Sequence, residues 1–307
     1  MDQYSELFAL ERGAAALSEP LSHTDRQEDL VARVIAIANQ KGGVGKTTTA
    51  VNLAASLAVA ERRTLLIDGD PQGNATSGTG IEPGSFERTS YDVLLGTADI
   101  GSTRLRGVQF QHLDVVPATP DLAGAEVELV DTPDREQRMR HAVEAIRGEY
   151  DFILIDCPPS LGLITLNMLA AADALLIPVQ CEYYALEGLS QLLNTVHLIQ
   201  HSVNPSLAIS GVLLTMYDAR LNLSRQVATD AREYFGSQVF DTVGPRNVRL
   251  AEAPSFGKPI ILYDVQSIGA QAYIAVAHEL IARETAVAKA HHHEMSVVDG
   301  ASQEASA

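Results

Sequence analysis

The chain has 307 residues, of which 46% are apolar and 20% are charged, a balance typical of a globular protein with a sizeable core. Its formal net charge is −17; residues 1–30 contribute −5 and residues 288–307 contribute −2, which leaves about −10 for residues 31–287. This acidity excludes a general electrostatic attraction to nucleic acid, so any nucleic-acid contact would need a local group of arginines.

The composition also indicates where the protein works. The sequence has no apolar run of about 18 residues, so we expect no transmembrane helix. Its N-terminus lacks a basic segment followed by an apolar one, so we expect no signal peptide. Cys157 and Cys181 are the only cysteines and have no CxxC spacing, which favours two small buried residues in a reducing cytoplasm.

The first ordered element is predicted after a polar extension. Residues 1–30 are rich in Ser, Glu and Ala, and we expect them to be mobile. Residues 34–38 are continuously apolar and predict a buried strand, and an Ala- and Leu-rich helix is expected to start near Lys46 and to end near residues 61–63. A glycine loop joins them, which is the context that a phosphate-binding loop requires.

The rest of the chain alternates strands and helices. A glycine- and serine-rich loop is expected over residues 73–85. Further strands are predicted over residues 64–67, 113–116, 152–155, 174–178, 209–214 and 238–240. Further helices are predicted over residues 91–95, 134–148, 161–171, 186–201, 224–235 and 269–290. Unalternated apolar strands separated by helices predict an α/β fold, a single doubly wound domain whose mostly parallel sheet is covered on both faces.

The glycine loop carries the first chemistry. Gly42, Gly43 and Gly45 let backbone N–H groups surround anionic oxygens, and the N-terminus of the following helix adds its positive end. Lys46 is placed to reach the β- and γ-phosphates of a nucleotide, and the hydroxyl of Thr47 is placed to bind Mg²⁺.

The loop departs from the general pattern G-x-x-x-x-G-K-[ST] at its first position. Gln40 stands where the first glycine belongs, and Lys41 follows it as a second lysine. This extra lysine is the anomaly that a functional interpretation has to explain.

Carboxylates follow two of the predicted strands. Asp68 and Asp70 come after residues 64–67, and Asp156 comes after residues 152–155. Ligands of an open parallel sheet collect at the carboxyl ends of its strands, so these groups are candidates to hold Mg²⁺ through water or to orient an attacking water. Taken singly, each could instead be an ordinary cap or turn aspartate.

The chain as a whole resembles the ParA/Soj family of chromosome- and plasmid-partitioning ATPases, within the deviant Walker A class that includes MinD. The resemblance runs from about Val34 to Val287. It rests on the segments KGGVGKTTTAVNLA (41–54), DGDPQGNATSG (68–78), PATPDLAGAEVELV (117–130), DCPPSLGLITLN (156–167), PVQCEYYALEGLSQLLNT (178–195), LLTMYDAR (213–220) and PRNVRLAEAPSFGKPI (245–260).

The resemblance implies roles for the loop and the carboxylates. Lys41 would reach across an ATP-sandwich homodimer to the partner's nucleotide, and a side chain at Gly42 would clash there. Asp70 matches the residue that positions the attacking water, Asp156 the Walker B carboxylate, and Asp68 is expected to support Mg²⁺ through water. Segments 70–77 and 156–161 correspond to two switch regions that sense the γ-phosphate. The implied catalytic residues are Lys41, Lys46 and Asp70.

The same resemblance assigns the nucleotide contacts. The implied ATP-binding residues are Lys41, Gly42, Gly43, Val44, Gly45, Lys46, Thr47, Thr48, Met216, Pro245 and Asn247. The implied Mg²⁺ ligands are Thr47, Asp68 and Asp156. Relatives commonly carry an apolar residue at the position of Gly244, so a glycine is expected to loosen the adenine-contacting segment.

The partners implied by the resemblance are DNA and a ParB-type partition protein. Arg220 and Arg249 match arginines that contact DNA, with Arg246, Arg225 and Lys258 as further candidates. Each arginine would neutralise a backbone phosphate without reading sequence. A surface arginine without this resemblance would be interpreted as solvated or ion-paired. The implied protein is cytoplasmic, associates with the nucleoid as an ATP dimer, and is released when the partner stimulates hydrolysis.

Two other functions use the same nucleotide core. A MinD-like membrane-associated ATPase would need a basic amphipathic helix at its C-terminus, whereas residues 296–304 are acidic and polar. A reductase or ligase resembling an iron protein would need suitably placed cysteines for a shared cluster. The expected organisation is an extension over 1–30, an ATPase domain over 31–287, and a disordered tail over 288–307 in which the histidines 291–293 are solvated.

Overall fold

The computed structural model describes the backbone of residues 32–182 and 185–304, and the side chains of residues 32–182 and 193–287. The extension over residues 1–30 and the side chains of the histidines 291–293 lie outside this described part. Within it, no helix is long and apolar enough to cross a membrane.

The centre of the molecule is a parallel sheet of six strands in the order β3-β2-β4-β1-β5-β6. The strands are β1 (Arg33–Ile37), β2 (Thr64–Asp68), β3 (Leu113–Val116), β4 (Phe152–Asp156), β5 (Ala174–Gln180) and β6 (Ala208–Thr215). The chain runs outward from β1 to one edge and then to the other, so the direction of winding changes beside β1. The sheet confirms the doubly wound α/β fold expected from the continuous apolar strands.

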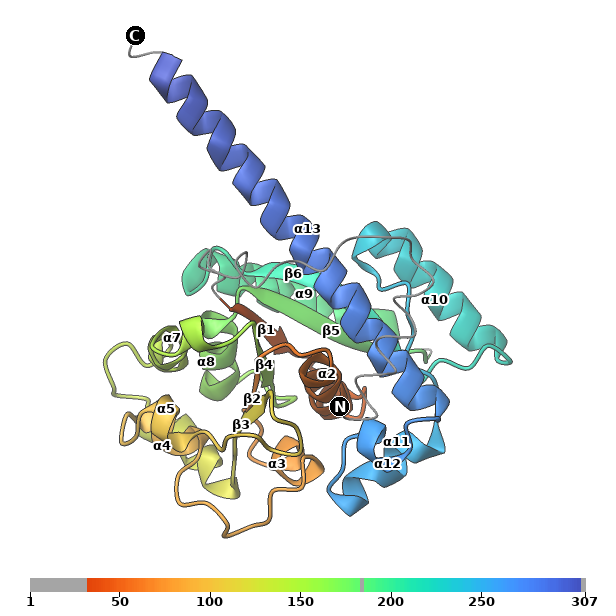
Figure 1. Ribbon diagram of the computed structural model, residues 1–307, viewed down its shortest axis with the longest axis horizontal. Helices are drawn as coiled ribbons and strands as arrows, with labels where there is room; N and C mark the ends of the chain where they lie inside the picture. Colours follow the sequence, from red (N-terminus) through yellow and green to blue (C-terminus); the bar gives the residue numbers. More distant parts are fainter. Residues whose placement is uncertain (1–31, 183–184, 305–307) are drawn as a thin grey trace.

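Helices cover both faces of the sheet (Figure 1). They are α2 (Lys46–Val59), α3 (Asn74–Gly78), α4 (Ser90–Leu95), α5 (Ile100–Thr103), α6 (Ala125–Glu128), α7 (Arg138–Glu144), α8 (Leu163–Ala171), α9 (Ala185–Ser202), α10 (Asn222–Phe235), α11 (Val248–Glu252), α12 (Ile260–Tyr263) and α13 (Ile268–Glu304). Short 3₁₀ turns follow α11 (η4, Ala253–Phe256) and precede β4 (η2, Arg147–Glu149).

Successive residues of each strand enter two different cores. In β1, Val34 and Ala36 join the core that packs against α8, whereas Ile35 and Ile37 join the core that packs against α2 and α13. All four side chains are fully buried. Two covered faces explain why the strands show no polar alternation in the sequence.

The structure corrects four local predictions. The expected loop over 73–85 contains α3, and the expected strand over 238–240 is a single bridge between Val212 and Val239. The helix expected over 134–148 starts only at Arg138, because Asp134 has a left-handed φ of 52° that no helix continues. The last helix does not end near Ala290 but continues to Glu304, so the backbone of residues 288–304 is helical where a disordered tail was expected. Figure 1 shows α13 lying beside α2 and then extending away from the sheet.

Candidate active site

The phosphate loop connects β1 to α2 at the carboxyl end of the sheet. Gly43 and Gly45 have φ angles of 75° and 89°, which only glycine adopts without strain, and Gly45 caps α2. A Cβ built on Gly42 or Gly43 would meet no atom of the described residues within 4 Å. The loop therefore presents open space beside backbone N–H groups at a helix N-terminus, which fits a phosphate chain.

Neighbouring strands fix the shape of this loop. The side-chain amide of Asn39 donates to the carbonyl of Pro178 in β5 (2.8 Å), and its Oδ1 accepts from the backbone N–H of Lys41 (3.0 Å). From β6, the hydroxyl of Thr215 donates to the carbonyl of Val44 (2.8 Å). Sequence reasoning assigned no role to Asn39 or Thr215. The only signal for Asn39 was its place directly after a strand.

The two lysines of the loop occupy different environments. Lys46 is buried, its Nζ donates to the carbonyl of Lys41 (3.3 Å), and burial lowers its pKa while the charge of Asp156 raises it. Lys41 lies at the rim with a side chain 34% exposed, and its Nζ is 3.8 Å from Oε2 of Glu182. Lys46 thus belongs to the chain's own site, whereas Lys41 remains accessible from outside.

Two carboxylates lie side by side where β2 and β4 end. Asp68 and Asp156 are register partners, and both are fully buried. Among the described residues, neither oxygen of Asp156 accepts a hydrogen bond of regular geometry. Burial, and next the charge of Asp68, hold the pKa of Asp156 well above its usual range, and the nearby hydroxyl of Thr47 and charge of Lys46 lower it only in part. A buried carboxylate whose oxygens are so poorly satisfied is a place for a cation.

Asp68 is held differently. Its Oδ2 accepts from the backbone N–H and the hydroxyl of Thr76 (2.7 Å each), and its Oδ1 accepts from the N–H of Asp70 (3.2 Å). Burial raises its pKa to about 6 in spite of these bonds. Its oxygens therefore fix the segment that follows β2. The contact between Asp68 and Thr76 was not predicted from the sequence.

The residues present fit a magnesium-bound nucleotide. The unpaired oxygens of Asp156 and the adjacent Thr47 hydroxyl offer oxygen ligands at the open loop. Within the described residues, no group of three or more His, Cys, Asp or Glu side chains is placed to hold a metal by itself. A Mg²⁺ ion here would complete its shell with phosphate and water oxygens, as is usual for this ion.

Asp70 lies in the turn that joins β2 to α3. It is 8% exposed, its Oδ1 accepts from the N–H of Gln72 (2.9 Å), and its carbonyl accepts from the N–H of Gly73 (2.9 Å). Gly73 has a left-handed φ of 63° and caps α3. The turn brings Asp70 to the same edge as Asp68 and Asp156, as the sequence predicted.

The expected adenine segment lies beside the end of β6. Tyr217 and Pro245 form a parallel bridge, and Met216 has a strained φ of 51°. Oδ1 of Asn247 caps α11 by accepting from the N–H of Leu250 (3.2 Å), which leaves its NH₂ group for a ligand. Gly244 does not loosen the segment, since its N–H donates to Leu214 (2.7 Å) and its carbonyl accepts from Tyr217 (3.0 Å).

The expected DNA arginines are exposed and paired with carboxylates. The guanidinium of Arg220 lies 2.7 Å from Oδ2 of Asp218 and lowers the pKa of that carboxyl to about 2. Arg249 on α11 lies 3.1 Å from Glu252 and 3.5 Å from Asp264. Further cations on these segments are Arg246, Arg225 and Lys258. The structure thus places Arg220 and Arg249 on segments that follow β6 and pairs each of them with a carboxylate.

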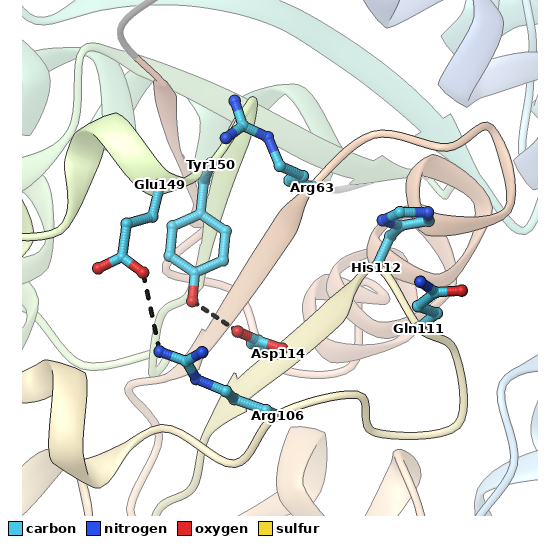
Figure 2. Close-up of a pocket in the computed structure, with 7 residues that line it drawn as sticks. All are labelled: Arg63, Arg106, Gln111, His112, Asp114, Glu149 and Tyr150. Atoms are coloured by element: carbon cyan, nitrogen blue, oxygen red, sulfur yellow. Dashed lines mark hydrogen bonds and ion pairs between the residues drawn. The ribbon is translucent and has the colours of Figure 1, made fainter.

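A polar pocket lies at the other end of the sheet (Figure 2). Its lining residues are Arg63, Arg106, Gln111, His112, Asp114, Glu149 and Tyr150. The hydroxyl of Tyr150 donates to Asp114 (2.7 Å), and Glu149 lies 2.6 Å from the buried Arg104 and 3.8 Å from Arg106. These groups precede β2, β3 and β4 or lie near their starts, so they serve the packing of the sheet and not the phosphate site.

Known proteins share the sequence throughout this region. A family model described as an AAA domain matches residues 32–209. The chromosome partitioning protein ParA of Myxococcus xanthus is 56% identical over 279 residues, which cover 91% of this chain and 97% of that protein. The sporulation initiation inhibitor protein Soj of Bacillus subtilis is 59% identical over 250 residues, which cover 81% of this chain and 98% of that protein.

A solved structure shares the fold at lower identity. The cobyrinic acid a,c-diamide synthase of Mycobacterium smegmatis, with a bound ATP analogue and magnesium, superposes with a TM-score of 0.72 at 38% identity over 82% of this chain and 95% of that chain. The identity to the partitioning proteins is much higher over a similar span. The chain therefore belongs to the ParA/Soj family of chromosome-partitioning ATPases.

Proposed function

We propose that the protein is a Mg²⁺-dependent ATPase that partitions DNA and works as an ATP-sandwich homodimer. The observation that carries the proposal is that the two lysines of the loop lie in different places. Lys46 is buried in the chain's own site, and Lys41 lies at the rim. A rim lysine that contacts the partner's triphosphate would make dimerisation depend on the nucleotide, because its desolvation is compensated only when phosphate is present.

Different residues of the site would have separate roles in ATP hydrolysis. The loop N–H groups and Lys46 would hold the β- and γ-phosphates, and Asp156 with Thr47 would hold Mg²⁺, which neutralises charge on the phosphates. Asp70 would orient the attacking water, while Asp68 keeps Asp70 and α3 in place through its bonds to Asp70 and Thr76. Met216, Pro245 and the amide of Asn247 would contact adenine.

DNA binding would use Arg220 and Arg249 of both subunits. Four phosphate contacts predict a slope of about −3.6 in a plot of log affinity against log salt, and a loss of roughly a hundredfold between about 50 and 200 mM salt. We propose that this contact is independent of DNA sequence, that it places the protein on the nucleoid in the cytoplasm, and that a ParB-type partner ends it by stimulating hydrolysis.

The experiment compares Arg220→Ala and Arg249→Ala with the native protein in binding to duplex DNA, with ATP and with ADP. We expect the native protein to bind DNA much more tightly with ATP than with ADP, and each variant to bind more weakly with ATP and to halve the salt slope to about −1.8, because the dimer loses two of four contacts. Arg106→Ala, an exposed arginine at the opposite end of the sheet, is the matched control. DNA retention that both variants leave unchanged would contradict the assigned DNA surface.

A further inference from the structure

One exposed side chain outside the active site is held in a backbone conformation that it would not adopt freely. Gln109 has a φ of 63°, in the left-handed region that disfavours residues with a Cβ. Its neighbours Val108 and Phe110 pack against the core that covers α2 and α13. The chain is thus fixed on both sides of Gln109, and the N–H of Phe110 donates to the carbonyl of Val108 (2.7 Å), which closes a tight turn around Gln109 and directs its side chain away from that turn.

The side-chain amide of Gln109 joins two segments that are distant in the sequence. Its Nε2 donates to the carbonyl of Thr79 (3.1 Å) and, more weakly, to the carbonyl of Gly257 (3.4 Å). An amide nitrogen carries two donors, so one glutamine can serve both carbonyls. We refer to Gln109 with Thr79, Gly80 and Gly257 as the Gln109 bridge.

The two glycines of the bridge touch through their backbones. Gly80 and Gly257 have φ angles of 81° and 60°. A Cβ on Gly80 would lie 2.6 Å from the carbonyl oxygen of Gly257, and a Cβ on Gly257 would lie 2.9 Å from the Cα of Gly80. No side chain fits between the segments, so a shift of one is transmitted directly to the other.

One end of the bridge is tied to the nucleotide site. Thr79 closes α3, and its N–H and hydroxyl both bond to the carbonyl of Ala75 (3.1 and 3.0 Å). Within α3, Thr76 donates twice to Asp68 at 2.7 Å. Asp68 also accepts from the N–H of Asp70, so a movement of Asp70, the residue proposed to orient the attacking water, would be passed through Asp68 to α3.

The other end of the bridge is tied to the proposed DNA surface. Gly257 ends η4, which follows α11 without a break, and α11 carries Arg249. Beyond Gly257, the N–H of Ile260 donates to Asn52 on α2 (2.7 Å). The segment between Arg249 and Ile260 is therefore held to the phosphate-loop helix by Asn52 and to α3 by Gln109, so a movement of α3 relative to α2 must act on it.

We propose that Gln109 is a positioning residue that couples the nucleotide-sensing segment to the DNA-binding helix α11, through its hydrogen bonds to Thr79 and Gly257. The inference rests on the proposed function, since it needs Arg249 to contact DNA. The Gln109 bridge would then contribute to the dependence of DNA affinity on ATP.

The test separates coupling from stability and from binding. Gln109→Glu keeps the shape but presents carboxylate oxygens to two carbonyls, and Gln109→Gly removes the amide while permitting the positive φ. Gln111→Gly, two residues along the same loop and on the polar pocket of Figure 2, is the matched control. Each protein is measured for affinity to duplex DNA with ATP and with ADP, for ATP hydrolysis without DNA, and for Tm.

We expect both Gln109 variants to keep ATP hydrolysis within about twofold and to lose about tenfold in the ratio of DNA affinity with ATP to that with ADP, which is the size of effect that one or two hydrogen bonds produce. The control should keep the native ratio. A native ratio in both Gln109 variants, with or without a lowered Tm, would overturn the coupling role. A DNA affinity and salt slope that Arg249→Ala leaves unchanged would instead overturn the proposed DNA surface, so the two failures are distinct.

Discussion

Asp156→Asn should stabilise the ligand-free protein. The carboxylate of Asp156 is fully buried, neither oxygen accepts a hydrogen bond of regular geometry from the part of the chain that the structure describes, and it lies beside the buried carboxylate of Asp68. A buried charge without partners costs free energy that binding of Mg²⁺ would offset. Asparagine keeps the size and removes the charge, so the variant relieves this cost and the repulsion of Asp68 together.

The magnitude follows from the cost of burying a polar group without partners, which is about 1–3 kcal/mol and larger for a charged group. Burial raises the pKa of the neighbouring Asp68 to about 6 although it accepts three hydrogen bonds, so the same cost acts on both carboxylates. Asp156 lacks such bonds, but its charge also supports the ammonium of Lys46, which the variant would lose. We therefore expect a net gain of about 1–3 kcal/mol, at about 2–4 °C in Tm per kcal/mol.

The pH dependence has a definite sign. A carboxyl whose pKa is raised by folding costs nothing below its unfolded pKa near 4, and its cost grows as the pH rises until the folded pKa is passed. The ligand-free native protein should therefore lose stability as the pH rises from about 4 through 6 and above. The advantage of Asp156→Asn should be largest at neutral pH and should shrink towards pH 4.

The assay is thermal unfolding of both proteins with and without Mg-ATP, from pH 4.5 to 7.5. Mg-ATP at about 100 times its Kd should stabilise the native protein by about 2.7 kcal/mol, whereas the variant should gain less because it binds the metal poorly. The difference in stability between the variant and the native protein should therefore narrow or reverse when Mg-ATP is present. A variant that is less stable than the native protein without ligand at pH 7.5 would refute the argument that Asp156 is an uncompensated buried charge.

The remaining predictions concern the switch. Asp70→Ala should bind ATP and form the dimer but hydrolyse ATP at least about a hundredfold more slowly, the usual scale for a lost proton-transfer or positioning group, and normal turnover would contradict its role. Lys41→Ala should keep basal hydrolysis and lose the stimulated rate, measured with DNA and the ParB-type partner; normal stimulation would show that Lys41 does not act on the second nucleotide. Gly42→Val should fold with a native Tm, since a Cβ there meets nothing within 4 Å in one subunit, yet it should stay monomeric with ATP by size-exclusion chromatography. If that variant still formed a dimer with ATP, Gly42 would not lie in a crowded contact between the two subunits.

The sequence predicts the parts of the site that depend on local signals. The phosphate loop is flanked by an apolar strand and a helix, and each conformation follows from adjacent residues such as Gly43 and Gly45. Asp68 and Asp156 could be brought together from the sequence because the carboxyl ends of parallel strands share one edge. These predictions need only the period of the strands and the order of the elements.

The parts that could not be predicted depend on contacts distant in the sequence. Helix α3 was expected to be a loop because its sequence, Asn-Ala-Thr-Ser-Gly, has weak helical propensity. Thr76 donates twice to Asp68 and accepts from the N–H of Ala118, 42 residues away, and these contacts override that preference. The strained Gln109 is equally invisible in the sequence, since its partners lie 30 and 148 residues away.

The ion pairs of the arginines would make the proposed DNA binding of this acidic protein conditional on its dimerisation. In one subunit, Arg220 and Arg249 are neutralised by Asp218, Glu252 and Asp264, so each arginine offers little free charge to DNA. Exposed pairs of this kind are weak, and a DNA phosphate can displace a carboxylate at small cost. Because affinity rises steeply with the number of phosphates contacted, two contacts would give a monomer far weaker binding than four would give a dimer, and the acidic surface would weaken it further. In the proposed function, DNA binding would then follow dimerisation, and dimerisation would follow the nucleotide that Lys41 is proposed to contact.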